Sequence, residues 1–382
     1  MIRKSEAYKE EDEMITKTLF PGCYIQGDGA IERLKDELPK FGQEGLCIMT
    51  ASSGERLKER LPETTATLRL HDAEFGGECS DREIDRHVEA AKNCGAQFIV
   101  AIGGGKTIDT GKITADRLGI PVVVVPTIAS TDAPCSACAI VYSEEGAVIR
   151  VEYQKNNPNL VLVDSSIIAN APARFLVSGM GDALATWFEA ESCRKNNAKN
   201  EAGELGSHTA YALSRICYDT LLEYGADALA ACKDHQATPA LEHVIEANTL
   251  LSGLGFESGG LAMAHSIHNG LTVLHQTHDY FHGEKVAMGV LASLFLREET
   301  KPFIDEVYTF CESIGLPTTL AGIGLGEATA EELERVAVRA CRADEQIHHE
   351  GSDITPEVVI RTLLAADAEG KRRNHEKSAD RR

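Results

Sequence analysis

Short apolar runs rich in β-branched residues alternate with amphipathic stretches up to about residue 165. This alternation is typical of βαβ units and predicts a parallel sheet. Residues 29–41 and 80–95 have helical spacing, and the second stretch begins with Ser80 as a predicted N-cap and Glu83 as its capping-box partner. The predicted strands are LCIMT at 46–50, ATLRL at 66–70, QFIVAIG at 97–103 and PVVVVPT at 121–127.

The pattern changes after NNPNLVLVD at 156–164, and from Pro172 onward nearly every segment is rich in Ala, Leu and Glu at helical spacing. A chain of 382 residues also exceeds the size at which one hydrophobic core usually keeps growing. We therefore predict two domains. The first, residues 1–168, is an α/β domain with a Rossmann-like parallel sheet, and the second, residues 169–382, is all helical.

Composition narrows the choice of partners. The 59 acidic and 38 basic side chains give a net charge of −21, which would repel the phosphate backbone of a nucleic acid. The N-terminal MIRKSEAYKEEDEM lacks the apolar core of a signal peptide, and no later segment is apolar for long enough to span a membrane. We expect a cytoplasmic protein that acts on small molecules, with charged ends at 1–16 and 371–382 that are loosely held.

Eleven cysteines are scattered singly along the chain, so free thiols are expected rather than a disulfide framework. Cys135 and Cys138 have the spacing of a redox or zinc pair. No second C-x-x-C exists to complete a four-sulfur zinc site, so buried or loop thiols are the favoured interpretation.

The stretch AIGGGKTIDTGK at 101–112 resembles a phosphate-binding loop without matching either common pattern. A P-loop needs glycine where Val100 stands, and the dinucleotide fingerprint needs a third glycine where Ile108 stands. A glycine-rich turn between a buried strand and a helix nevertheless leaves free backbone N–H groups that an anion can approach. The stretch therefore predicts a phosphate site, and the alternative is a tight turn that needs glycine for its dihedral angles.

Three segments of the helical half concentrate polar residues in apolar surroundings. Asp182 is expected at the start of a helix, His265 within an apolar helix, and His282 at the start of another. One carboxylate and two imidazoles could form a three-ligand site with an open position, as catalytic zinc or ferrous iron requires. Alternatively, Asp182 is only an N-cap, and His265 and His268 are core histidines. The segments are GMGDALATWFEA at 179–190, GLAMAHSIHNGL at 260–271 and YFHGEKVAMG at 280–289.

These three segments follow GGGKTIDTGK and PTIASTDAPCSA in an order that resembles the metal-dependent, group III (iron-containing type) alcohol dehydrogenases. Within that family, FGGECSDREID, NNPNLVLVD and ALEHVIEANTLLSGLGFESGGLA are most similar to glycerol dehydrogenases. The resemblance runs from about residue 21 to about residue 367, so it covers both predicted domains.

The resemblance implies an NAD-dependent enzyme with a cleft between its domains, assembled as a homo-oligomer that is commonly an octamer. Asp182, His265 and His282 would bind one divalent metal, zinc in most glycerol dehydrogenases and iron in several relatives. Asp132 matches the acidic residue near the substrate. The pyrophosphate of NAD would lie on Gly103, Gly104, Gly105, Lys106 and Thr107, and the rest of its path would be lined by Thr127, Ser130, Ser136, Cys138 and Tyr142.

These residue types suit the implied reaction. A dication that binds two adjacent hydroxyls lowers the pKa of one of them, so that hydride can leave the secondary carbon for nicotinamide. Glycerol would become dihydroxyacetone, and related vicinal diols would react alike. Asp132 could orient a hydroxyl or relay its proton, or it could be only a turn residue in STDAP. Lys106 could be a solvated loop charge, and His268 could support the site without binding metal.

Other functions remain alternatives. A glycerol-1-phosphate dehydrogenase or a dehydroquinate synthase-like lyase would need basic residues around an anionic substrate, and the three metal segments offer only Lys285, which favours a neutral polyol. The broken P-loop opposes a nucleotide hydrolase. A metal-binding or NAD-binding protein without catalysis is opposed by the presence of Asp132 beside all three candidate ligands.

The turn after the first predicted strand departs from the family. Glycerol dehydrogenases usually place there an acidic residue that binds the adenosine ribose, but this chain has Ala51, Ser52 and Ser53. Ser52, Ser53 or Arg56 could contact a 2′-phosphate. Because no cluster of basic residues surrounds this turn in the sequence, NAD is expected to be preferred, with more tolerance of NADP than the family usually shows.

Overall fold

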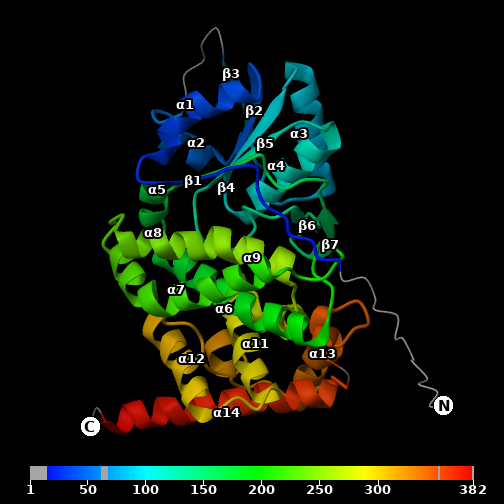
Figure 1. Cartoon of the computed structure of the whole chain (residues 1–382), viewed down its shortest axis with the longest axis vertical. Helices are drawn as coiled ribbons and strands as arrows, with labels where there is room; N and C mark the ends of the chain where they lie inside the picture. The colour runs from blue at the N-terminus through cyan, green and yellow to red at the C-terminus, as the bar shows by residue number, and fades with distance from the viewer. Residues whose placement is uncertain (1–14, 62–67, 352, 381–382) are drawn as a thin grey trace, which may run out of the picture.

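The computed structural model describes residues 15–61, 68–351 and 353–380. Its first half is built on a six-stranded sheet in the order β1-β8-β5-β4-β2-β3, in which every neighbouring pair is parallel (Figure 1). The predicted parallel sheet is therefore confirmed. The strands are β1 (Tyr24–Gly27), β2 (Glu44–Met49), β3 (Arg69–Glu74), β4 (Phe98–Gly103), β5 (Val122–Pro126) and β8 (Leu160–Asp164).

Helices cover both faces of this sheet, which is why β4 and β5 are apolar and buried at every position. On one face, Val100 and Val123 pack against α1 (Leu34–Glu37) and α2 (Ala51–Leu57). On the other face, Ile99 shares a core with α3 (Asp81–Cys94) and α4 (Gly105–Leu118) and with the helical half of the chain.

Two predicted elements differ in detail from those observed. The stretch 29–41 forms two 3₁₀ turns, η1 (Ala30–Arg33) and η2 (Leu38–Lys40), on either side of α1, and Pro39 lies in the second turn. The strand predicted at 66–70 begins at Arg69 and continues to Glu74, while residues 66–67 lie outside the described part of the chain.

At the start of α3, the predicted N-cap is confirmed, but the predicted capping box is wrong. The Ser80 hydroxyl accepts a hydrogen bond from the Glu83 N–H at 3.3 Å, as an N-cap should. The Glu83 carboxylate does not return to Ser80, because it accepts the Gly76 N–H at 2.7 Å and binds Arg86. The capping box is therefore absent, and Glu83 instead holds the loop before the helix.

A small antiparallel sheet, β6 (Cys138–Tyr142) and β7 (Val148–Tyr153), was not predicted. Its turn contains Gly146 with a φ of 86°, a conformation that favours glycine. The alternation in VIRVEY and this glycine are the signals in the sequence that indicate a hairpin.

No named strand follows β8 in the described residues, so the predicted helical half is confirmed. The change from sheet to helices falls close to the boundary expected at 168–169, although the division into two domains stays a prediction. The helices are α5 (Ser165–Ala169), α6 (Ala173–Asn196), α7 (His208–Lys233), α8 (Pro239–Glu246), the π-helical turn η3 (Ala247–Leu251), α9 (Ser252–Gly259), α10 (Met263–Leu271), η4 (His275–Thr277), α11 (His282–Leu296), α12 (Lys301–Ile314), η5 (Leu320–Ile323), α13 (Ala330–Ala340), η6 (Gln346–Glu350) and α14 (Pro356–Asp380).

The C-terminal segment is not loosely held as expected. Helix α14 continues to Asp380 and lies across the end of the helical half that is remote from the sheet (Figure 1). Arg373 pairs with Glu312 and Asp305 of α12, which fixes the charged end by ion pairs. Residues 1–14 of the other charged end lie outside the described part. None of the helices in the described ranges is long and apolar enough to cross a membrane.

Candidate metal and cofactor site

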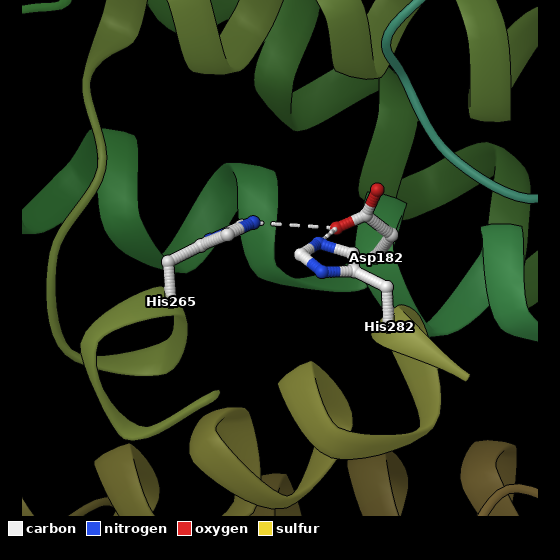
Figure 2. Close-up of side chains that lie close together, drawn as sticks. All are labelled: Asp182, His265 and His282. Carbon is white, nitrogen blue, oxygen red and sulfur yellow. Dashed lines mark hydrogen bonds and ion pairs between the residues drawn. The ribbon is translucent and has the colours of Figure 1, made fainter. Parts of the chain in front are cut away.

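Asp182, His265 and His282 meet at one point although they come from three different helices (Figure 2). Asp182 lies in the middle of α6, His265 in the first turn of α10, and His282 is the first residue of α11. The Asp182 Oδ1 atom is 3.3 Å from His265 Nε2 and 2.9 Å from His282 Nε2. One ligand atom from each residue lies within 4.8 Å of the other two, so a single ion could contact all three.

Glycines bring α6 and α11 into backbone contact beside the site. A Cβ atom on Gly283 would lie 1.7 Å from the Ser178 carbonyl oxygen, and one on Gly181 would lie 2.4 Å from the Gly283 carbonyl oxygen. Only residues without a side chain allow this approach. The crossing therefore places the imidazole of His282 directly against Asp182.

The expected position of Asp182 at the start of a helix is wrong. The residue lies in a helix that begins at Ala173, and it is only 1% exposed. An N-cap role is thereby excluded, because Pro172 occupies the N-cap position of α6. His265 and His282 lie where the sequence predicted them.

The electrostatics of the three residues are those of a tightly coupled group. Burial alone would raise the pKa of Asp182, but the two neighbouring imidazoles hold that pKa well below its usual range. Burial would lower the pKa of His265, whereas Glu189 and Asp182 hold it well above the ordinary value. The second carboxylate oxygen of Asp182 is buried with no hydrogen-bond partner. An unpartnered buried oxygen next to two imidazole nitrogens is what a bound cation would satisfy.

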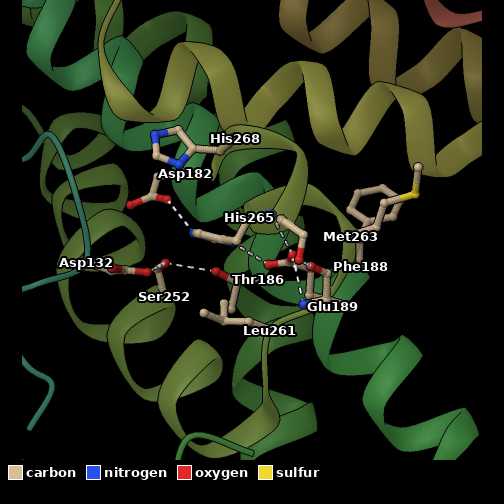
Figure 3. Close-up of polar contacts among 12 residues, drawn as sticks. Asp132, Asp182, Thr186, Phe188, Glu189, Ser252, Leu261, Met263, His265 and His268 are labelled. Atoms are coloured by element: carbon tan, nitrogen blue, oxygen red, sulfur yellow. Dashed lines mark hydrogen bonds and ion pairs between the residues drawn. The ribbon is translucent and has the colours of Figure 1, made fainter. Parts of the chain in front are cut away.

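Glu189 and His268 support the triad from behind. Glu189 is 1% exposed, and its carboxylate accepts a hydrogen bond from His265 Nδ1 at 2.6 Å and one from the His265 backbone N–H at 2.9 Å (Figure 3). This contact leaves His265 Nε2 as the nitrogen that faces Asp182. His268 Nε2 lies 3.1 Å from His282 Nδ1, and this contact leaves His282 Nε2 as the nitrogen that faces Asp182.

Sequence reasoning gave no role to Glu189. The signal was present, because Glu189 follows Asp182 by two helical turns in an otherwise apolar segment and therefore shares its face of α6. Burial, and then the neighbouring His282 and Lys285, lower the pKa of His268 well below its ordinary value. A neutral His268 suits the supporting role that was considered for it.

Asp132 lies in the loop after β5 and is held from the helical half. The Ser252 hydroxyl donates to Asp132 Oδ2 at 2.9 Å and lies 2.8 Å from the Thr186 hydroxyl (Figure 3). Burial and the nearby charge of Asp182 raise the pKa of Asp132 well above its ordinary value. The Asp132 carboxyl group is therefore hydrogen-bonded to Ser252, and it is close enough to Asp182 for the charge of that residue to raise its pKa.

The glycine-rich stretch forms the turn from β4 into α4 at the centre of the sheet. Gly104 is the N-cap of α4, and no side chain caps this helix. A Cβ atom on Gly103 would lie 2.6 Å from the Thr107 hydroxyl, so the turn itself needs glycine. The strand order reverses between β2 and β4, and ligands of open α/β sheets bind at the carboxyl ends of strands at such a point. The turn thus meets the requirements of both interpretations, a tight turn and an anion site.

Lys106 is not free for a phosphate in this structure. Its Nζ atom lies 2.6 Å from both carboxylate oxygens of Glu78 and 4.7 Å from the centre of the Tyr142 ring. Lys106 therefore forms an ion pair with Glu78 while its side chain stays 39% exposed, and Tyr142 lies beside it.

The other predicted cofactor residues follow one another along the loop after β5. The Thr127 N–H donates to the Gly103 carbonyl at 3.0 Å, which places the loop next to the glycine turn. The Ser130 carbonyl accepts a hydrogen bond from Ser178 of α6, which ties the loop to the helical half. Ser136 is fully buried, and its hydroxyl lies 3.5 Å from the Cys138 thiol.

All eleven cysteines are free thiols, as expected. Burial raises the pKa of the Cys138 thiol to about 12, and it raises that of Cys135 as well. Within the described ranges, the group of side chains able to hold a metal does not include Cys135 or Cys138.

The turn after β2 has the composition that the sequence indicated. Thr50 caps α2, and its hydroxyl accepts the Ser53 N–H at 3.2 Å. Ser53 is 4% exposed, whereas Ser52 lies at the surface, where its carbonyl accepts from Arg56. Ala51 is the first residue of α2.

Comparison with known proteins places this geometry among characterised relatives. The family described as iron-containing alcohol dehydrogenase matches residues 21–165. A glycerol dehydrogenase from Thermotoga maritima is 54% identical over 95% of this chain and 100% of its own length. The crystal structure of glycerol dehydrogenase from Schizosaccharomyces pombe matches with a TM-score of 0.91 and 34% identity, over 96% of this chain and 93% of that one. The crystal structure of a probable glycerol dehydrogenase from Sinorhizobium meliloti 1021 matches with a TM-score of 0.88 and 42% identity, over 94% of this chain and 99% of that one.

Proposed function

Because this chain belongs to the iron-containing alcohol dehydrogenase family, we propose that it oxidises glycerol to dihydroxyacetone, with NAD as the hydride acceptor and a divalent metal at Asp182, His265 and His282. The observation that carries the proposal is the convergence of these three side chains in a chain that is 54% identical to a glycerol dehydrogenase along 95% of its length. Related vicinal diols are substrates of the same chemistry.

The residues present fit a divalent metal. The buried, unpartnered Asp182 oxygen and the two Nε2 atoms provide three donors, and Glu189 fixes the orientation of one imidazole. Zinc and ferrous iron both accept this donor set, and zinc is the metal that the family resemblance implies. When bound, the cation supplies Lewis-acid chemistry, since it lowers the pKa of an alcohol that it polarises.

The chain's own groups then orient the diol and move its proton. Asp132 is the carboxyl group available to accept a hydrogen bond or a proton from a substrate hydroxyl, and Ser252 fixes one of its oxygens by a hydrogen bond of 2.9 Å. The loop that carries Asp132 also touches α6 through Ser130. This loop links the candidate cofactor turn to the triad, as hydride transfer between a bound alcohol and a bound nicotinamide requires.

NAD is proposed to bind at the carboxyl ends of β2 and β4. The uncapped start of α4 at Gly104 would offer its N–H groups to the pyrophosphate, with Gly103, Gly105, Lys106 and Thr107 around it. Because Glu78 already neutralises Lys106, the backbone N–H groups carry more of this proposed anion site than the lysine does. Thr127, Ser130, Ser136, Cys138 and Tyr142 are proposed to line the rest of the path.

A neutral polyol remains the preferred substrate over a phosphorylated or carbocyclic anion. Lys285, the basic residue that the metal segments offered, is 7% exposed, and burial lowers the pKa of its amine. The Nζ atom lies 3.4 Å from the Thr277 carbonyl. Glycerol-1-phosphate dehydrogenase or dehydroquinate synthase-like activity would need a cationic pocket, which Lys285 does not supply in this position.

One assay tests the proposal directly. NADH formation is measured with glycerol, 1,2-propanediol, 2,3-butanediol and glycerol 1-phosphate, and metal content is determined on the same preparation. We expect turnover of the neutral diols, about one equivalent of zinc per chain, and no turnover of the phosphate ester. Turnover of glycerol 1-phosphate alone would replace this proposal with the anionic-substrate alternative. The implied homo-oligomer, an octamer in the family resemblance, is tested by native mass spectrometry.

A further inference from the structure

The second half of the stretch AIGGGKTIDTGK is buried and is not used by the proposed cofactor site. Lys112 lies two turns after the start of α4 and is 2% exposed. Its ammonium group donates to the carbonyl oxygens of Ala133 at 2.9 Å and Ser136 at 3.2 Å, and to that of Cys138. An ammonium group has three N–H donors, so these carbonyls use all of them.

Two buried carboxylates hold the same segment by its N–H groups. Asp109, one turn before Lys112, accepts the Ile140 N–H at 3.0 Å and lies 3.3 Å from the Lys112 ammonium. Glu257 of α9 accepts the Ala137 N–H at 2.6 Å. The segment 133–140, which follows Asp132 directly, is thus fixed both by α4 and by the helical half.

We propose that Lys112 is a positioning residue, which with Asp109 fixes the loop carrying Asp132 relative to the helix that begins at the candidate cofactor turn. Lys112 touches neither the triad nor Asp132. It acts through the backbone, because α4 presents Gly104 at its start and holds residues 133–140 from its middle. The anchoring of residues 133–140 by Lys112 and Asp109, the clamp, rests on the geometry. Its consequence for catalysis rests on the proposed function.

Charge balance explains why the residue is a lysine. Asp109 is 5% exposed and Glu257 is 2% exposed, and a buried carboxylate is costly unless a positive charge and hydrogen bonds accompany it. The ammonium group of Lys112 provides the positive charge and three short, divergent donors. A guanidinium is larger and directs its donors within one plane, so arginine is not an equivalent replacement at this buried position.

The test uses two substitutions and a matched control in the metal-containing enzyme. K112M keeps an unbranched side chain that is one atom shorter, and it removes both the charge and the three N–H donors. The double variant D109N/K112M also removes the carboxylate that lies next to the ammonium group, so that Asp109 is not left unpaired if the single variant folds poorly. The control is D367N, which removes a buried carboxylate of α14 that accepts the Leu320 N–H, far from the loop in the sequence.

Hydrogen–deuterium exchange provides a readout that does not depend on activity. We expect the amides of residues 133–140 to exchange at least about tenfold faster in K112M or D109N/K112M, while the control leaves them unchanged. We also expect kcat for glycerol to fall about 10- to 100-fold, as loss of reacting geometry does. The isotope effect on kcat with glycerol deuterated at C2 should rise, because hydride transfer then limits the rate.

The outcomes separate the clamp from the function. Unchanged exchange at 133–140 in both variants, or an equal increase in D367N, would overturn the clamp. Faster exchange with wild-type kcat and isotope effect would overturn the positioning role. If the wild-type enzyme does not oxidise glycerol, the exchange measurement still decides on the clamp, and only the proposed function fails.

Discussion

At the scale of single residues, we expect metal binding to require all three side chains of the triad. A site with two remaining donors no longer holds a divalent ion firmly. We expect H282A to lose both metal and turnover, while the circular dichroism spectrum stays that of the wild type because His282 is the first, partly exposed residue of α11. Metal analysis by mass spectrometry and a glycerol assay check this. H275A, in the short turn η4, is the control and should keep both. Full metal occupancy in H282A would remove His282 from the ligand set.

Asp132 should affect turnover but not binding. In D132N we expect metal content and NAD affinity to stay within about threefold of the wild type, and kcat to fall by about 10²-fold, the usual scale for loss of a proton-transfer group.

The pH dependence follows from the raised pKa of Asp132. A base acts in its ionised form, so kcat of the wild type should rise as pH increases through this raised pKa. D132N should lack that rise. Diol kinetics that match the wild type across the pH range would leave Asp132 without a catalytic role.

At the scale of elements, the sequence predicted the parallel sheet and the helical half because periodicity depends on local burial. It could not indicate that Asp182 lies in mid-helix, since the preceding Gly179 and Gly181 read equally well as a loop. Gly181 is explained by the crossing of α6 with α11, and Gly179 by the close approach of the Ala129 carbonyl and of Asn248. The end of α14 was predicted loose because its charges have no visible partner in the sequence, and α12 supplies that partner.

The helix crossing gives a stability prediction. In G283A the added methyl group would lie 1.7 Å from the Ser178 carbonyl oxygen, so α6 and α11 must separate. We expect a loss of about 3 kcal/mol or more in the free energy of unfolding, measured by urea denaturation, together with loss of metal. G54A, in helix α2, is the matched control, because the nearest atom to its Cβ, on the Met49 side chain of β2, would be 3.8 Å away. There the change should be neutral or stabilising by up to about 1 kcal/mol.

The turn between β2 and α2 gives a prediction about the cofactor. Ser53 is buried against Thr50, so of the three polar side chains considered for a 2′-phosphate contact, Ser52 and Arg56 remain at the surface. We expect NAD to be preferred over NADP in kcat/KM, by less than about 10³-fold, because no carboxylate in this turn repels a 2′-phosphate. A larger preference would mean that a carboxylate outside the turn excludes NADP, and a preference for NADP would contradict the assignment of NAD.

At the scale of the whole molecule, the ligands come together from positions that no periodicity connects. Their order in the chain pointed to the site only through the family resemblance, whereas their residue types alone left a core histidine or an N-cap equally open. Glu189 and Lys112 were missed for the same reason, since their partners lie far away in the sequence or in a loop whose shape could not be derived.

The net charge of −21 gives a prediction for the molecule as a whole. Repulsion among excess acidic groups is screened by salt, with a Debye length of about 10 Å at 0.1 M. We expect the Tm from calorimetry to rise when sodium chloride increases from about 20 to 200 mM. A fall in Tm would show that surface ion pairs such as those of α14 outweigh the overall repulsion.

The packing of α11 against α14 also sets the order in which the protein can mature during synthesis. The sheet is complete at Asp164, before any of the three candidate ligands has left the ribosome, so the α/β half can fold first. His282 begins α11, and α11 finds its last packing partner only when the final helix has been made. The three candidate ligands therefore take their final places only after the residues of both α11 and α14 have been made.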